Sequence, residues 1–241
     1  MIITSKSNIL IKDIIKLNDK KYRRESGLYL VEGLKPVNEC INSGGEIERI
    51  VCTEKLSENY LNSVVVSEDV FKTISSEKTP QGVIAVVRIP KTDLKPPVNN
   101  CILLDRIQDP GNLGTIIRTA NAAGYRELYM INCTDPYSPK AVRASMSGIF
   151  FVGINQGSRE EVLKVLEGVP IICADMSGTD IFSFKVPEKF CLCIGNEGSG
   201  IDEEIKKISN HRVKIPMSET CESLNAAVSA GISMYVLKNM T

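Results

Sequence analysis

The regular alternation of short apolar segments with helical patterns after residue 100 most constrains what this chain can fold into. Residues 101–105, 127–131 and 190–195 are apolar almost throughout, instead of at every second position. Strands of this kind are buried on both faces, as in a parallel sheet covered by helices. The C-terminal part is therefore predicted to be an α/β domain with a parallel sheet.

Each expected element of this part is defined by its residues. Expected strands are 101–105, 127–131, 150–154, 170–174, 190–195 and 211–216, and expected helices are 112–123, 139–147, 160–166, 202–208 and 222–238. Ligands of parallel sheets normally bind beyond the carboxyl ends of the strands. The loops after residues 105, 131, 194 and 215 are therefore the places to search for a site.

The N-terminal part predicts a smaller α/β domain. Its expected strands are 29–33, 47–52, 63–67 and 82–88, and its expected helix is 8–18. A polar stretch with three prolines follows at residues 89–100, and paired prolines fit neither a helix nor a central strand. We expect a first domain at 1–92, a linker at 93–100 and a second domain at 101–241.

Composition excludes several classes of enzyme. The only histidine is His211 and none of the eight cysteines forms a CxxC pair, so we expect no metal site. Neither the P-loop pattern nor the G-x-G-x-x-G dinucleotide fingerprint occurs. No apolar run reaches the length of a membrane span and no secretory leader is evident, so we expect a cytoplasmic protein without membrane contact.

Two of the predicted loops carry ligand-binding chemistry. The turn at residues 109–111 leads to Asn112 at a helix start and to Arg118 off the apolar stripe of that helix. Residues 195–200 contain three glycines around Asn196 and Glu197, directly after a buried strand, and glycines let the backbone approach a ligand. Taken singly, a solvent-exposed arginine and a connecting turn explain these residues equally well.

A third loop completes the pattern. It follows Ile215 and Pro216 and carries Glu222, Ser223 and Asn225 at the start of the last helix. Ser223 alone is explained as a helix N-cap. Three such loops at carboxyl ends of parallel strands together predict a small-molecule site.

These segments resemble the three motifs of the SpoU (TrmH) family of RNA ribose methyltransferases, within the SPOUT superfamily. Asn112 to Arg118 matches N-x-G-x-x-x-R, residues 195–198 match G-N-E-G, and residues 215–225 match the motif that runs from I-P to S-L-N. The segment LYLVEGLKPVNECI at residues 28–41 is similar to the small L30e-like RNA-binding module that precedes many members.

The resemblance implies a trefoil knot in the catalytic domain, a homodimer, and S-adenosylmethionine bound in the knot. It implies cofactor contacts by Gly195, Asn196, Gly198, Ile215, Pro216, Met217 and Leu224. The implied catalytic residues are Asn112, Arg118, Glu197, Ser223 and Asn225, and Arg118 is the proposed activator of a ribose 2′-hydroxyl. The implied product is a 2′-O-methylated nucleotide. Cys221 stands where members often have Gly or Ala, which puts the choice of substrate in doubt.

RNA is the expected partner, with ribosomal RNA ahead of transfer RNA. Residues 1–35 hold eight lysines and arginines against four acidic residues, in a chain whose net charge is zero. The candidate RNA contacts are Lys20, Lys21, Arg23, Arg24 and Lys35. A solvated helix face explains the same charges without RNA.

Other functions remain open at this point. They are an inactive RNA-binding factor of the ribosome, a SPOUT-like enzyme that methylates a base, and an unrelated α/β enzyme that binds NAD or ATP. Within the family, the sequence does not separate housekeeping modification from antibiotic self-resistance.

Overall fold

The computed structural model describes residues 2–240, so Met1 and Thr241, the outer ends of the two expected domains, lie outside it. Contacts divide the chain into two compact units. The first comprises the residues up to Lys91 together with Asp135–Phe150, and the second comprises Thr92–Thr134 and the residues from Phe151 onward. The division expected from the sequence placed 135–150 in the C-terminal domain, so the two divisions differ in that segment.

The first unit contains a mixed five-stranded sheet in the order β1-β4-β3-β5-β2. Its strands are β1 (Ile2–Ile3), β2 (Leu28–Glu32), β3 (Ile47–Thr53), β4 (Val64–Val66) and β5 (Val83–Arg88). Its helices are α1 (Ile9–Lys16), α2 (Lys20–Ser26), α3 (Leu34–Asn42), α4 (Glu68–Ile74) and α6 (Pro139–Ala144), with short 3-10 turns η1 (Glu54–Leu56) and η2 (Gly148–Phe150). Strand β5 pairs antiparallel with β3 and β2, which makes this sheet mixed.

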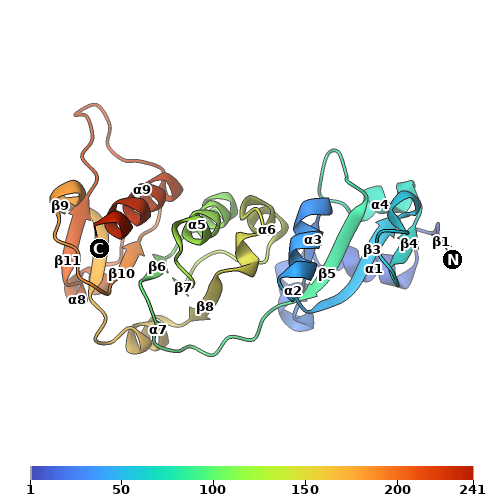
Figure 1. Ribbon diagram of the computed structural model, residues 1–241, viewed down its shortest axis with the longest axis horizontal. Helices are drawn as coiled ribbons and strands as arrows, with labels where there is room; N and C mark the ends of the chain where they lie inside the picture. Colours follow the sequence, from blue (N-terminus) through green and yellow to red (C-terminus); the bar gives the residue numbers. More distant parts are fainter. Residues whose placement is uncertain (1, 241) are drawn as a thin grey trace. The chain divides into compact units, whose positions relative to one another are not determined.

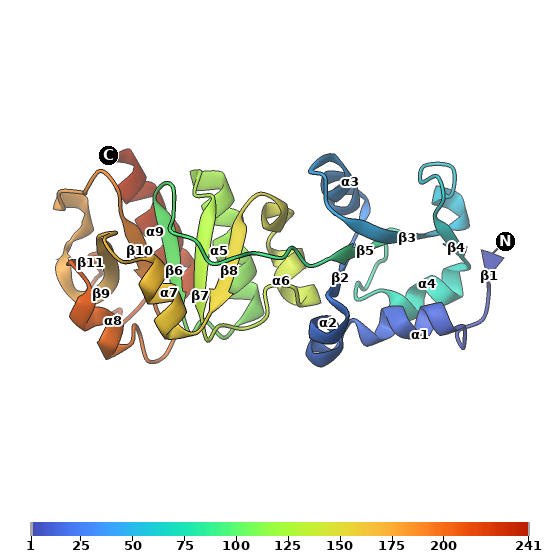
Figure 2. The same cartoon turned by 90° about the horizontal axis from the view of Figure 1, so that it is seen from below.

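Helix α1 packs on this sheet through Ile11 and Ile14, which are buried with Phe71 and Ile84. The Asn8 side chain caps the helix by accepting a hydrogen bond from the Leu10 amide. The helix ends before the expected residue 18. Helix α2 follows at once, and Figure 2 shows the two helices along the same side of the unit.

Arg23 on α2 is buried, although we expected it to contact RNA. Its Nη2 lies 2.6 Å from Asp135 Oδ2, and its Nη1 donates to the Leu17 carbonyl at 2.7 Å. The Arg23 side chain is 3% exposed. Asp135 is far away in the sequence, so the residues near α2 could not predict this ion pair. Arg23 therefore holds the first unit together and is removed from the candidate RNA contacts.

We expect Arg23→Ala to lower the free energy of unfolding by about 3–5 kcal/mol, because it leaves the Asp135 carboxylate without its partner. Urea unfolding followed by circular dichroism measures this loss. The matched control is Arg24→Ala, since Arg24 is the exposed neighbour on the same helix; its effect is expected within about 0.5 kcal/mol. Equal stability of the two variants would contradict the structural role of Arg23.

The second unit is built on a six-stranded sheet in the order β11-β9-β10-β6-β7-β8, with every neighbouring pair parallel. Its strands are β6 (Cys101–Asp105), β7 (Glu127–Ile131), β8 (Gly153–Gly157), β9 (Ile171–Asp180), β10 (Cys191–Ile194) and β11 (His211–Lys214). Its helices are α5 (Pro110–Ala123), α7 (Arg159–Val165), α8 (Glu203–Ile208) and α9 (Ala226–Asn239), with the 3-10 turn η3 (Ile181–Ser183). Within this unit, α5 and α9 lie on one face of the sheet and α7 and α8 on the other (Figures 1 and 2). The predicted α/β fold with a parallel sheet is confirmed; the trefoil knot stays a prediction.

Several expected elements differ from the structure in their bounds. Strand β9 runs to Asp180 instead of residue 174, and α6 ends at Ala144 instead of residue 147. The strand expected at 150–154 is shifted, because residues 148–150 form a 3-10 turn and β8 runs from 153 to 157. The last helix begins at Ala226 instead of residue 222, because the Asn225 side chain caps it through the Ala227 amide.

The proline-rich stretch expected to be a linker is hydrogen-bonded to the second unit. Thr92 donates to the Ile154 carbonyl, and the Tyr129 hydroxyl donates to the Lys95 carbonyl. Farther along, Lys189 Nζ donates to the Pro97 carbonyl at 2.6 Å. From Thr92 onward, this stretch therefore follows the second unit closely.

The eight cysteines are all free thiols, and six of them are buried. Cys191 lies opposite Cys101, and Cys193 lies opposite Cys173, on neighbouring strands of the parallel sheet. All four belong to one apolar cluster of the core. They pack as small apolar side chains. Among the described residues, no group of three or more His, Cys, Asp or Glu is placed to hold a metal ion. No helix in the described part of the chain has the length and hydropathy to cross a membrane.

Candidate active site

The glycine loop after β10 folds tightly back on itself. The amides and carbonyls of Asn196 and Gly200 exchange two hydrogen bonds of 3.0 Å. A Cβ atom on Gly195 would lie 2.6 Å from the Gly200 carbonyl oxygen and still closer to two other backbone atoms. Position 195 therefore requires glycine, and Gly200 adopts the left-handed conformation with φ of 67°.

The Asn196 side chain fastens this loop. Its Nδ2 donates to the Arg106 carbonyl at 2.8 Å, and its Oδ1 accepts from the amides of Gly198 and Ser199. These bonds occupy the amide group on both sides. Asn196 thus shapes the loop that surrounds it.

Asp105 and Arg106, at the end of β6, fasten the loop from the other side, and sequence reasoning missed both. The carboxylate of Asp105 is fully buried and accepts from the Asp202 amide at 2.8 Å. Arg106 contacts this carboxylate and also donates to the Gly200 carbonyl at 3.3 Å. Arg106 has a positive φ of 58°. The sequence signal that could have indicated Asp105 and Arg106 is a pair of charged residues directly after an apolar strand.

Three residues predicted from separate loops form one chain of hydrogen bonds. Asn225 Oδ1 caps α9, which leaves Nδ2 to donate to Asn112 Oδ1 at 2.9 Å. Asn112 Nδ2 in turn donates to Glu197 Oε1 at 2.9 Å. The helix cap therefore sets the direction of both side-chain amides. The chain ends on a carboxylate that acts only as an acceptor when it is ionised.

Glu197 is held in its ionised form. Burial favours the neutral carboxyl, but hydrogen bonds from Asn112 and from the amides of Gln108 and Asp109 outweigh it and lower the pKa of Glu197. The two amides belong to the loop that leads into α5. At neutral pH the negatively charged Glu197 therefore accepts hydrogen bonds that connect the glycine loop to the start of α5.

A cavity of about 370 Å³ lies beside this hydrogen-bonded chain. The expected residues that line it are Gly195, Asn196, Glu197, Gly198, Ile215, Met217, Ser223 and Leu224. Pro216 is expected to bind the cofactor but is not among the lining residues, whereas its two neighbours are.

The cavity also contains residues that the sequence motifs did not indicate. Asp175 and Met176 reach it from β9, and Ser229 and Ser233 reach it from α9. Burial opposes ionisation of Asp175, but hydrogen bonds from Ser177 and Lys206 lower its pKa to about 2. The Ser233 hydroxyl is buried and has no hydrogen-bond partner among the described residues. A polar residue after an apolar strand was again the signal that pointed to Asp175.

Comparison with known proteins places this geometry in a family. Residues 99–235 match the model of the SpoU rRNA Methylase family, and residues 8–85 match an MRM3-like substrate binding domain. The chain belongs to the SpoU rRNA methylase family. The resemblance drawn from the three motifs is confirmed.

SpoU relatives match along nearly the whole chain. The chain is 33% identical over 246 residues to the 23S rRNA (guanosine(2553)-2'-O)-methyltransferase RlmP of Bacillus subtilis (strain 168), covering 98% of this chain and 98% of the relative. It is 29% identical over 244 residues to a 23S rRNA (uridine(2479)-2'-O)-methyltransferase of Streptomyces viridochromogenes, covering 91% of this chain and 85% of the relative.

Solved SpoU structures have the same fold. An AdoMet-bound rRNA methyltransferase from Sinorhizobium meliloti superposes with a TM-score of 0.90 at 30% identity, over 99% of this chain and 97% of that one. The SpoU methyltransferase AviRb from Streptomyces viridochromogenes, in complex with AdoMet, superposes with a TM-score of 0.87 at 27% identity. The match covers 96% of this chain and 97% of that one.

Arg118 of this SpoU chain does not join the other predicted catalytic residues. It lies on the exposed side of α5 and is not among the residues lining the cavity. In the part of the chain that the structure describes, no hydrogen bond or ion pair holds its guanidinium. The structure therefore joins Asn112, Glu197 and Asn225 by hydrogen bonds and places Ser223 with Glu197 on the cavity wall. Arg118 lies apart from them.

The candidate RNA contacts other than Arg23 are exposed. They are Lys20, Lys21, Arg24 and Lys35. Lys21 lies 3.9 Å from Glu25 and Lys35 lies 3.8 Å from Glu39, and the two lysine side chains are exposed. Such pairs are weak and leave the lysines able to meet phosphate.

Proposed function

We propose that this protein is an S-adenosylmethionine-dependent enzyme that methylates a ribose 2′-hydroxyl of ribosomal RNA. The observation that carries the proposal is the chain of hydrogen bonds from Asn225 through Asn112 to Glu197, which borders the cavity of Gly195 in a member of the SpoU family. The named relatives that methylate 23S rRNA at the 2′-oxygen support the choice of substrate.

The residues around the cavity fit S-adenosylmethionine. The volume is within the range of small-molecule sites, and the glycine loop of Gly195 and Gly198 forms part of the wall. Asp175 and Glu222 on the wall suit a ligand with positive charge, and the unpartnered Ser233 hydroxyl is available to bind its polar atoms. When bound, this cofactor supplies an electrophilic methyl group.

The 2′-hydroxyl becomes a strong nucleophile only as it loses its proton. Arginine stays protonated near neutral pH, which makes Arg118 a poor base. We assign it to binding the phosphate next to the target ribose and to stabilising negative charge on the 2′-oxygen. Glu197 and the two asparagines hold the start of α5 against the glycine loop, and Ser223 contacts the substrate from the third loop.

A homodimer accounts for the position of Arg118. The side chain is exposed and apart from the cavity of its own chain. Helix α9 also exposes Val228 and Tyr235, at 50% and 46%. We propose that a second copy covers this apolar surface and that its cavity lies near the exposed side of α5. The helix is otherwise rich in small residues, which permit close packing.

Methyl transfer from labelled S-adenosylmethionine tests the function. Purified ribosomal RNA and transfer RNA are offered in separate reactions, with Arg118→Ala as the inactive control. We expect label in ribosomal RNA alone, recovered after nuclease digestion as a 2′-O-methyl nucleoside. Label in transfer RNA alone would show that transfer RNA is the substrate. Label on a base would contradict the proposed methylation of the ribose. Cofactor binding without label in any RNA, including ribosomal assembly intermediates, would favour an inactive RNA-binding factor.

A further inference from the structure

The first unit contains a second cavity, of about 400 Å³, that the methyl-transfer site does not use. It is lined by residues of β2, α3, α4 and α6 and of the loops beside them, all of which belong to this unit. Leu30, Ile74 and Val142 supply buried or partly buried apolar wall. An apolar wall with a few polar groups is the usual composition of a site for a small organic ligand.

Glu32 presents a fixed acceptor to this cavity. Its Oε2 accepts from the amide and hydroxyl of Ser76 at 2.9 and 3.0 Å, and its Oε1 accepts from the Ser75 hydroxyl. A carboxylate oxygen accepts about two hydrogen bonds, so Oε1 retains capacity for one further donor. The carboxylate is thus held in place with an acceptor to spare.

Gln81 and Asn18 add groups of both kinds. Gln81 Oε1 accepts from the Leu34 amide at 2.8 Å, which leaves its Nε2 as a donor. Asn18 Nδ2 donates to the Ile15 carbonyl at 3.0 Å, which leaves its Oδ1 as an acceptor. Donors and acceptors beside an apolar wall match the edge of a nucleobase, whose ring faces are apolar and whose edge carries both.

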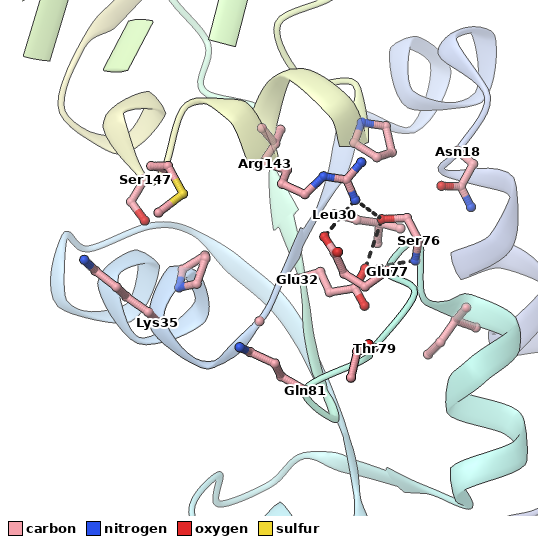
Figure 3. A pocket seen from close by; sticks show the side chains of 16 residues that line it. Asn18, Leu30, Glu32, Lys35, Ser76, Glu77, Thr79, Gln81, Arg143 and Ser147 are labelled. Atoms are coloured by element: carbon pink, nitrogen blue, oxygen red, sulfur yellow. Dashed lines mark hydrogen bonds and ion pairs between the residues drawn. The ribbon is translucent and has the colours of Figure 1, made fainter. Parts of the chain in front are cut away.

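Cations lie at the rim of this cavity. Arg143 Nη1 donates to Glu77 at 2.7 Å and to the Ser76 hydroxyl at 3.3 Å, and the Arg143 side chain is 47% exposed. Figure 3 shows this guanidinium above Glu77 and Ser76, with Lys35 on a separate part of the wall. The Lys35 side chain is 73% exposed. A neutral base inside and phosphates at this rim would satisfy both kinds of group.

A strained turn completes the wall. Met146 and Ser147 both have positive φ, at 44° and 68°, although neither is glycine. Such strain is retained where the surroundings impose it, often at functional sites. The turn leaves Met146 53% exposed as a residue of the cavity wall. A thioether in this position contacts an aromatic ring favourably.

We infer that this cavity receives one unstacked nucleobase of the substrate RNA, with Lys35 and Arg143 contacting the flanking phosphates. The inference rests on the proposed function, because it takes ribosomal RNA as the substrate. Proteins read single-stranded RNA mainly through bases that are turned out of the stack. The cavity in the first unit thus contributes to the choice of RNA and takes no part in the methyl transfer itself.

Two variants of the full chain test the inference by kinetics. Met146→Ala removes the thioether, and Thr79→Trp fills the cavity from an exposed position of its wall. We expect each to raise the KM for ribosomal RNA about tenfold, in line with the loss of one stacked base. The kcat and the affinity for S-adenosylmethionine should not change. The matched control is Met240→Ala, an exposed methionine that forms the C-cap of α9.

Photo-crosslinking gives a readout that does not depend on turnover. Ribosomal RNA transcripts containing 4-thiouridine are irradiated with the enzyme, and crosslinked peptides are mapped by mass spectrometry. We expect crosslinks within residues 74–81 and 139–147, lost in Thr79→Trp. Crosslinks confined to the basic surface of α1 and α2, with unchanged KM in both variants, would overturn the inference. A KM effect on ribosomal particles but not on naked RNA would assign the cavity to a protein partner and also overturn it.

The two proposals fail in different ways. If the wild-type chain crosslinks ribosomal RNA through this cavity and transfers no methyl group to it, the proposed function is wrong and the cavity assignment stands. If methyl transfer to ribosomal RNA proceeds unchanged in both variants, only the cavity assignment is wrong.

Discussion

Arg118→Lys is expected to reduce kcat about a hundredfold while the Kd for S-adenosylmethionine stays within about twofold of the wild type. Lysine keeps the positive charge but loses the planar, two-pronged donor that binds phosphate and a developing oxyanion. Arg118 is exposed and apart from the cofactor cavity. The variant should therefore lose transition-state stabilisation and keep cofactor binding.

Single-turnover methylation of ribosomal RNA and calorimetric titration of S-adenosylmethionine separate these two quantities. Arg126→Lys is the matched control. Arg126 follows α5 in the same unit, and its guanidinium donates to Asn121 at 2.7 Å, away from the cavity. An Arg118→Lys variant that lost cofactor affinity and turnover equally would contradict the assigned role.

The largest effect on cofactor binding is expected from Gly195→Ala. A Cβ atom at this position would be 2.6 Å from the Gly200 carbonyl oxygen, and the nearest atoms are all backbone. Because backbone cannot turn aside as a side-chain tip can, the whole glycine loop must shift. The shift would also displace Glu197 from Asn112. We expect the affinity for S-adenosylmethionine to fall at least about a hundredfold, which corresponds to about 2.7 kcal/mol.

Calorimetric titration measures this loss, and Gly153→Ala is its control. Gly153 begins β8, and a Cβ there would be 3.4 Å from the Arg126 carbonyl oxygen, an ordinary contact. Its φ is not positive. Unchanged cofactor affinity in Gly195→Ala would show that the cofactor does not depend on this loop.

The same two positions test whether Arg118 acts on the cavity of a partner subunit. Mixed dimers of Arg118→Ala and Gly195→Ala would contain one site with an intact cavity and an intact arginine if the arginine acts across the interface. Random mixing of a two-fold dimer should then restore about a quarter of the wild-type turnover. No recovery after verified subunit exchange would place Arg118 and the cavity of one chain in the same site.

Much of the second unit was predictable from the sequence, because its strands are apolar throughout. Strands with buried apolar side chains such as Leu103 and Leu192 must be covered on both faces, and a parallel sheet between two layers of helices provides this cover. The carboxyl-end rule then indicated that Asn112, Glu197 and Asn225 belong near one another, although they lie in three separate loops. Their hydrogen bonds agree with that expectation.

The sequence by itself determined the periodicity of the strands, the positions of the caps and turns, and the family motifs, because each of these depends on residues within a short span. Only the tertiary structure decided which distant groups meet. Arg23 is buried because Asp135 is brought to it from 112 residues away, and the second cavity exists because residues 139–147 join the N-terminal unit. A contact between residues so far apart in the sequence depends on how whole helices and strands pack. Local sequence patterns therefore do not predict it.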